Sequence, residues 1–337
     1  MTSNTTADPS TVSTDTKGSR PRTMEESMKK AYATLAALLV LALVPVGCSM
    51  QRDDDEQAIT DLLNSSGYTD ESNDRSYGSE DTTLSDGSGG PGADDPRRPP
   101  FVRFRRCIPQ GGVSRTINIQ IPAYPGYPDS TALATVSTDI NGELRTMFDT
   151  TGNPILVWRK KFQDQAVRRV YLTRTRDGWR IRKVTPLEFR TVDAPYELRI
   201  RELKVHAASW RSQDTFRIHS GDTMLAKHDL PRFVPADTVT VWVEIESSGD
   251  SCWTFLHHGR PKWPHRWRRA YARTATHRFR GTWLVGDEQG QYPQVRPSGH
   301  DAIGWKSLWA DTTEPYVSAA WGLPYIVAEP NQELPEE

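Results

Sequence analysis

One stretch of the chain, residues 260–280, combines basic and aromatic side chains in a pattern that could bind anions. It holds eight lysine or arginine side chains, four interleaved aromatic rings and no acidic residue. Arginine forks bind phosphate or carboxylate, and their stems pack on aromatic faces. The same pattern also fits a solvated loop and an edge strand whose arginines discourage pairing with other chains. The candidate anion-binding residues are Arg260, Lys262, Arg266, Arg268, Arg269, Arg273 and Arg278.

Two shorter stretches contain residue types that metal sites and nucleophilic sites use. Cys252 precedes the pair His257 and His258. This spacing matches no common zinc pattern, and adjacent residues of a strand point to opposite faces. The stretch 298–301 contains serine, histidine and aspartate, but a nucleophilic triad needs such groups to converge from separate segments. We therefore predict no catalytic residues, no metal site and no cofactor, and we leave the question of enzymatic activity open.

Tryptophan is unusually frequent, with eleven residues in a chain of 337. Two pairs of aromatic residues, Trp305 with Trp309 and Trp321 with Tyr325, could stack on sugar rings if they were exposed. Aromatic side chains more often fill a core or the contact between domains, so we expect packing roles for them.

An apolar segment near the N-terminus is typical of exported proteins. Lys29 and Lys30 precede an uncharged run over residues 31–46, which is shorter than the roughly 20 residues that a membrane-spanning helix needs. The run closes on small residues and a cysteine, Val46-Gly47-Cys48. This ending resembles the bacterial lipoprotein signal, or lipobox. In that family a lipid, palmitate among its acyl chains, modifies the cysteine thiol, and the chain is cut just before it.

The lipobox resemblance implies a location and a set of partners. A lipid on Cys48 would anchor the protein to the cell membrane or the outer membrane, facing the periplasm or the exterior. Ser49 stands where inner-membrane lipoproteins of the family often have aspartate, so we expect the outer membrane where the cell has one. We predict no nucleic-acid partner for an exported chain, and envelope proteins or an anionic polymer instead. Residues 1–27 are predicted to be disordered or to precede the true start, and 28–47 to be the signal peptide.

Charge is distributed unevenly although the formal net charge is only −1. Residues 49–100 carry 13 acidic and 4 basic side chains, a net charge of −9, whereas residues 101–337 carry 26 acidic and 33 basic ones, a net charge of +7. The acidic part has few large apolar residues, which is typical of disorder. We predict an acidic tether over 48–100, with a short helix over 55–64 where apolar residues recur at helical spacing.

The rest of the chain has a β pattern, and we predict a mainly β protein with two antiparallel β-rich domains. The first, 101–192, reads as a curved meander sheet with one packed helix. Asn141-Gly142 favours a type I′ turn. The meander strands are expected at 131–138, 143–149, 155–162, 166–174 and 179–184, with a further break at 163–165. The helix and the closing strands, ending Arg176-Asp-Gly-Trp-Arg-Ile-Arg-Lys-Val184, resemble the nuclear transport factor two-like fold over about 55–190. That resemblance implies a helix-backed curved sheet with a cone-shaped pocket.

The second predicted domain spans 196–328 and looks like an immunoglobulin-like β-sandwich, followed by an acidic tail over 329–337. Residues 238–246 alternate cleanly, and the segment 198–205 alternates with one slip that a β-bulge would produce. The sequence thus favours a lipid-anchored envelope protein with a non-catalytic binding or structural role. The alternatives are a small-ligand-binding or enzymatic nuclear transport factor two-like domain, and a polyanion-binding module through 260–280.

Overall fold

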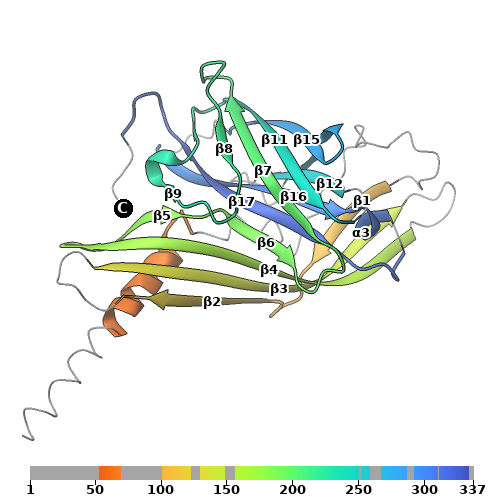
Figure 1. Ribbon diagram of the computed structural model, residues 1–337, viewed down its shortest axis with the longest axis horizontal. Coiled ribbons are helices and arrows are strands. Elements are labelled where there is room, and N and C mark those ends of the chain that lie inside the picture. The colour runs from red at the N-terminus through yellow and green to blue at the C-terminus, as the bar shows by residue number, and fades with distance from the viewer. Residues whose placement is uncertain are drawn as a thin grey trace, which may run out of the picture. The chain divides into compact units, whose positions relative to one another are not determined.

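The computed structural model describes residues 53–69, 101–122, 130–148, 156–249, 252–258, 267–286, 292–309 and 311–333. Within these ranges the chain is mainly β, as predicted, with a curled antiparallel sheet and a second sheet (Figure 1). The predicted signal segment, Cys48 and most of the predicted tether lie outside the described residues. No described helix is both long and apolar enough to cross a membrane. By their internal contacts, residues 58–337 form one compact unit, which contains all the strands.

The first sheet has twelve strands, and its main path runs β1-β3-β4-β6-β17-β16-β12-β13. Along this path the strands are β1 (Phe101–Cys107), β3 (Thr131–Phe148), β4 (Leu156–Thr175), β6 (Leu187–Thr191), β17 (Ser318–Val327), β16 (Gln294–Gly304), β12 (Cys252–His258) and β13 (Trp267–Ala270). Off the path lie β2 (Val113–Gln120), β5 (Gly178–Val184), β9 (Leu225–Ala226) and β10 (Arg232–Phe233). Because β6 and β17 are paired neighbours, the ranges predicted as two domains, 101–192 and 196–328, share this sheet.

The second sheet has five strands in the order β14-β15-β11-β7-β8. They are β14 (Ala272–Ala275), β15 (Arg278–Leu284), β11 (Thr238–Ser247), β7 (Leu198–Ala207) and β8 (Phe216–Ile218). The alternating face predicted for β11 is confirmed, since Val239, Val241, Val243 and Ile245 are buried in one core with residues of β16 and β17. The predicted bulge is confirmed as well. The register between β11 and β7 shifts between Glu244 and Ile245, so that Arg201 of β7 has no residue directly opposite it on β11.

The prediction of a turn at Asn141-Gly142 is wrong, and so is the break at 163–165. β3 and β4 run through both places, with Asn141 opposite Gln163 and Gly142 opposite Phe162. Glycine is needed at 142 for close packing, because a Cβ there would lie 2.5 Å from Cζ of Phe162 and 2.8 Å from the carbonyl oxygen of Cys107. The four strands predicted over 131–174 are therefore two long ones.

The helix predicted at 55–64 is confirmed and spans residues 53–65. Ile59 and Leu63 are fully buried and belong to the same core as Ala134 and Val136 of β3. The turn after the helix is held by Arg168 of β4, whose Nη1 donates to the carbonyl oxygen of Tyr68 at 2.8 Å. Helical periodicity thus marked the face that packs on the sheet.

The first sheet curls so that its distant strands meet across a second core. Phe104 of β1 contacts Phe255 of β12, with ring centroids 5.1 Å apart. Arg106 of β1 makes two hydrogen bonds to Asp301 of β16, at 2.7 and 3.1 Å, and both side chains are buried. Since β1 and β16 are separated by four strands along the sheet, only strong curvature can bring them together.

The chain passes from the first sheet to the second at Tyr271, between β13 and β14. The Tyr271 side chain is buried against Gly281 of β15, where an added Cβ would lie only 1.9 Å from the tyrosine ring. The remaining described helices are the short α3 (Trp305–Trp309) and the 3₁₀ turn η2 (Lys227–Asp229). Trp305 and Trp309 of α3 stack on each other, and Trp309 also stacks on Trp253.

Candidate functional site

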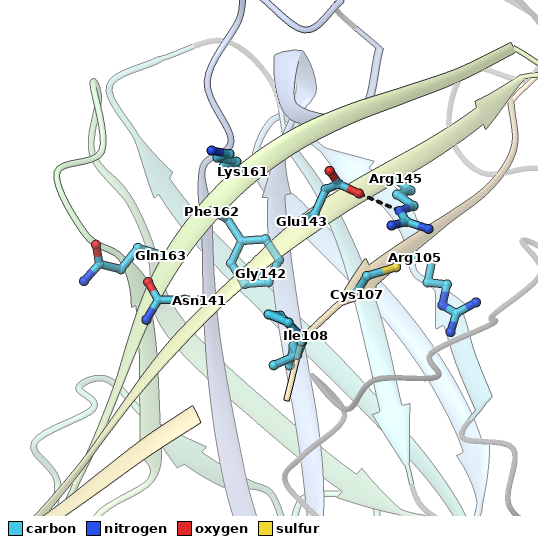
Figure 2. A pocket seen from close by; sticks show the side chains of 11 residues that line it. Arg105, Cys107, Ile108, Asn141, Gly142, Glu143, Arg145, Lys161, Phe162 and Gln163 are labelled. Atoms are coloured by element: carbon cyan, nitrogen blue, oxygen red, sulfur yellow. Dashed lines mark hydrogen bonds and ion pairs between the residues drawn. The ribbon is translucent and has the colours of Figure 1, made fainter. Parts of the chain in front are cut away.

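A hollow of about 820 Å³ opens beside β1, β3 and β4, and it is the candidate site (Figure 2). Its lining includes Arg105, Cys107, Glu143, Arg145, Lys161 and Phe162. Neighbouring side chains on the same strands, such as Arg106, Leu144 and Lys160, are buried on the opposite face. Because successive side chains of a strand alternate between faces, the charged lining residues point outward from the sheet.

Strand register arranges the charged residues of the hollow in two rows. The first row consists of Arg105 and Arg145, which line the hollow, and it continues to Arg159 on β4, directly opposite Arg145. The second row, one step of the pleat away, consists of Cys107, Glu143 and Lys161. Directly opposite residues of antiparallel strands have Cβ atoms roughly 5 Å apart, so each row is a continuous strip of side chains.

Glu143 is the one acidic residue among the described residues that line the hollow. Its Oε1 accepts a hydrogen bond from Nε of Arg145 at 2.6 Å and lies 4.0 Å from Nη1 of Arg159. The hydrogen bond from Arg145 to Glu143, and then the proximity of Cys107, raise the pKa of Arg145 above its ordinary value. Among the described residues of the lining, the basic side chains Arg105, Arg145 and Lys161 outnumber the one acidic side chain.

The thiol of Cys107 forms part of the wall of this hollow and is partly exposed. Cys252, by contrast, is fully buried in the core, and burial raises the pKa of its thiol to about 12. Both are free cysteines, and no disulfide joins them. Among these two thiols, Cys107 is the one that a reagent in solvent can reach.

The predicted anion-binding run is only partly described. Arg260, Lys262 and Arg266 lie outside the described residues, and Arg268 and Arg269 are described only through the backbone of β13, which pairs with β12. The part of the prediction that rests on these five side chains stays a prediction.

The two remaining members of the run have internal partners. Arg273 donates from Nη2 to the carbonyl oxygen of Cys252 at 2.8 Å and lies over the ring of Phe279. Nε of Arg278 lies 3.3 Å from a carboxylate oxygen of Glu244. Both residues belong to the second sheet, on β14 and β15.

The stretch 298–301 is divided between two faces of β16. Oγ of Ser298 lies 3.1 Å from Nε2 of His300, and Nδ1 of His300 lies 2.9 Å from the hydroxyl of Tyr271. Asp301 points the other way, to Arg106. Ser298, His300 and Asp301 are each at most 2% exposed. Ser298 and His300 are therefore packed in the core together with Tyr271, whereas Asp301 lies on the other face of the strand.

The inner face of the curled sheet carries a buried polar network beside its second hydrophobic core. The Tyr316 hydroxyl accepts a hydrogen bond from Nε of Arg106 at 2.8 Å and donates toward Oδ2 of Asp164 at 3.1 Å. Thr191 donates to the other carboxylate oxygen of Asp164 at 2.8 Å. Burial raises the pKa of Asp164 to about 6, although the Arg106 charge opposes this. These contacts tie β1, β4, β6 and the loop before β17 into one buried polar network.

Comparisons with protein-family models, with curated proteins and with solved structures found no match. Among the described residues, no group of three or more histidine, cysteine, aspartate or glutamate side chains could hold a metal ion. The hollow was missed by the sequence reasoning, although one local signal was present. Charged residues alternate with buried ones along β1, β3 and β4, but only the strand register shows that they form common rows.

Proposed function

We propose that this chain is a lipid-anchored protein of the bacterial cell envelope with a non-catalytic role, and that it binds a small ligand in the hollow beside β1, β3 and β4. The anchor rests on the lipobox-like ending at Cys48 and places the protein at the cell membrane or the outer membrane. The proposed resemblances to a nuclear transport factor two-like fold over 55–190 and to an immunoglobulin-like sandwich over 196–328 would both be compatible with a binding role.

The observation that carries the binding role is the cation-lined hollow itself. Its volume of about 820 Å³ lies in the range of small-molecule sites, which run from roughly 300 to 1,000 Å³. Its walls combine an apolar surface, Phe162 and Ile108, with a few polar groups that could orient a ligand.

Cell fractionation tests the anchor. Cys48→Ala should release the protein from the membrane fraction and leave an uncut chain, because the thiol that carries the lipid is absent. Ser49→Ala, which keeps the cysteine, is the matched control and should stay with the membrane. A full-length Cys48→Ala chain that still sediments with membranes would refute the lipid anchor.

Protection of Cys107 tests the binding role. Alkylation of Cys107 in the full-length protein by a neutral maleimide is followed by mass spectrometry of the peptide that begins at Cys107. Dialysable small molecules extracted from the cell envelope should slow this reaction, because a ligand in the hollow covers the thiol. An unchanged rate at every concentration of extract would contradict the proposal.

A further inference from the structure

The two arginines that lie side by side on β3 and β4, Arg145 and Arg159, cost stability unless an anion lies over them. Like charges at directly opposite positions of antiparallel strands repel each other. Arg145 and Arg159 are such a pair, and their side chains are 36% and 60% exposed, so solvent or a ligand can reach both. The sequence keeps two guanidinium groups side by side, where uncharged residues would pair with less strain.

Glu143 moderates this repulsion but occupies only one side of the row. Its carboxylate is bonded to Nε of Arg145, which leaves the Nη edge of that guanidinium for another acceptor. Its distance of 4.0 Å from Arg159 is longer than a hydrogen bond. Lys161, directly opposite Glu143 on β4, adds an ammonium group to the same strip.

We propose that the ligand of the hollow carries a phosphate group, which is held at the edge of the hollow. Arg145 and Lys161, which line the hollow, and Arg159, which lies directly opposite Arg145 on β4, bind this group. This inference rests on the proposed binding function and names the chemical class of the ligand. A phosphate group offers several oxygens in a tetrahedron, so it can accept hydrogen bonds from two guanidinium forks on neighbouring strands at once. Its double negative charge matches the excess of cations, and the rest of the ligand would lie against Phe162 and Ile108.

The phosphate group could belong to a soluble molecule or to a phospholipid headgroup, and the same chemistry recognises both. The experiment therefore uses two probes on the full-length protein. One is inorganic phosphate at millimolar concentration, and the other is vesicles of phosphatidylglycerol with phosphatidylcholine. Alkylation of Cys107 is the readout for both, because its thiol faces the same hollow. Chloride at equal ionic strength separates binding from screening of charge.

The expected result is that phosphate slows alkylation of Cys107 and that chloride does not. The double variant Arg145→Gln with Arg159→Gln should weaken this protection by about tenfold or more, since both charge-assisted contacts are lost. The double variant Arg145→Lys with Arg159→Lys keeps the charge but loses the fork geometry, so it should weaken protection less. Protection by anionic vesicles alone, and not by inorganic phosphate, would assign the phosphate group to a lipid headgroup.

Arg199→Gln with Arg201→Gln is the matched control. These arginines are exposed on the second sheet and also face carboxylates, so the variant has the same loss of charge at a distant surface. Phosphate protection should be unchanged in it.

Two outcomes would overturn the phosphate assignment. One is equal protection by chloride and phosphate, and the other is equal weakening in the control variant. If the envelope extract protects Cys107 and neither phosphate probe does, the binding function stands and the ligand class is wrong. If neither the envelope extract nor inorganic phosphate nor the vesicles protect Cys107, both the binding function and the phosphate assignment are refuted.

Discussion

Replacing Asp164 by asparagine should change how the stability of the protein depends on pH. Asp164 is fully buried on β4, and burial raises its pKa from 3.8 to about 6. The charged groups that act on it from other strands of the curled sheet are Arg106 of β1, which lowers this pKa, and Asp301 of β16, which raises it. Asparagine has nearly the same shape but cannot titrate, so the variant isolates the contribution of the carboxyl group.

The sign and size of the effect follow from the two pKa values. Between about pH 4 and pH 6 the folded protein keeps a proton on Asp164 that the unfolded chain releases. The free energy of unfolding therefore falls as the pH rises through this window, and it levels off above pH 6. A shift of about two pKa units corresponds to about 3 kcal/mol, which is an upper value for the whole window. The asparagine variant should lack this fall.

Urea unfolding followed by tryptophan fluorescence, at several values from pH 4 to pH 8, measures the effect. The free energy of unfolding of Asp164→Asn minus that of the wild type should increase between pH 4 and pH 7, by up to about 3 kcal/mol. Asp177→Asn, which removes an exposed carboxylate from the turn between β4 and β5, is the control. A difference that stays constant with pH, or decreases, would show that burial does not govern the proton on Asp164.

Three further substitutions probe the packing around this core. Burial lowers the pKa of Lys160 to about 8, so the free energy of unfolding of the wild type should rise between pH 8 and pH 10.5. Lys160→Met should lack this rise, as urea unfolding would show. Gly281→Ala should lower the free energy of unfolding by about 2 kcal/mol or more, visible as a lower Tm, because the added Cβ meets the Tyr271 ring. Arg106→Leu should cost about 3–5 kcal/mol by leaving Asp301 buried without its partner, and adding Asp301→Leu should recover much of this loss in urea unfolding.

The features that could be predicted from the sequence are those that depend on the residue pattern of a single helix or strand. The helix over 53–65 was marked by the spacing of Ile59 and Leu63, and the buried face of β11 by strict alternation. The bulge in the pairing of β7 with β11 was marked by a slip in that alternation. In each case the pattern of burial repeats along one segment, so nothing beyond that segment was needed.

The failures arise where a residue serves a contact distant in sequence. Asn141-Gly142 has the composition of a hairpin turn, but Gly142 is glycine because the Phe162 ring and the Cys107 carbonyl crowd its Cα. The pairing of β6 with β17, whose residues are more than a hundred positions apart, leaves no local signal either. The hollow could not be predicted for the same reason, because its rows of side chains form only when β1, β3 and β4 pair in the observed register.

The alternation of β1 joins the buried network and the hollow in a single strand. Arg106 points inward, where Asp301 and Tyr316 satisfy its guanidinium, while Arg105 and Cys107 point outward to the hollow. A shift of β1 by one residue would exchange these faces, burying Arg105 away from Asp301 and exposing Phe104. The buried ion pair therefore fixes the register that aligns the outward arginines. Burying the Arg106–Asp301 pair costs desolvation energy, and what the pair contributes in return is this choice of one strand register. A ligand bound in the hollow would stabilise the same register, because it binds only the folded protein in which the lining residues are aligned.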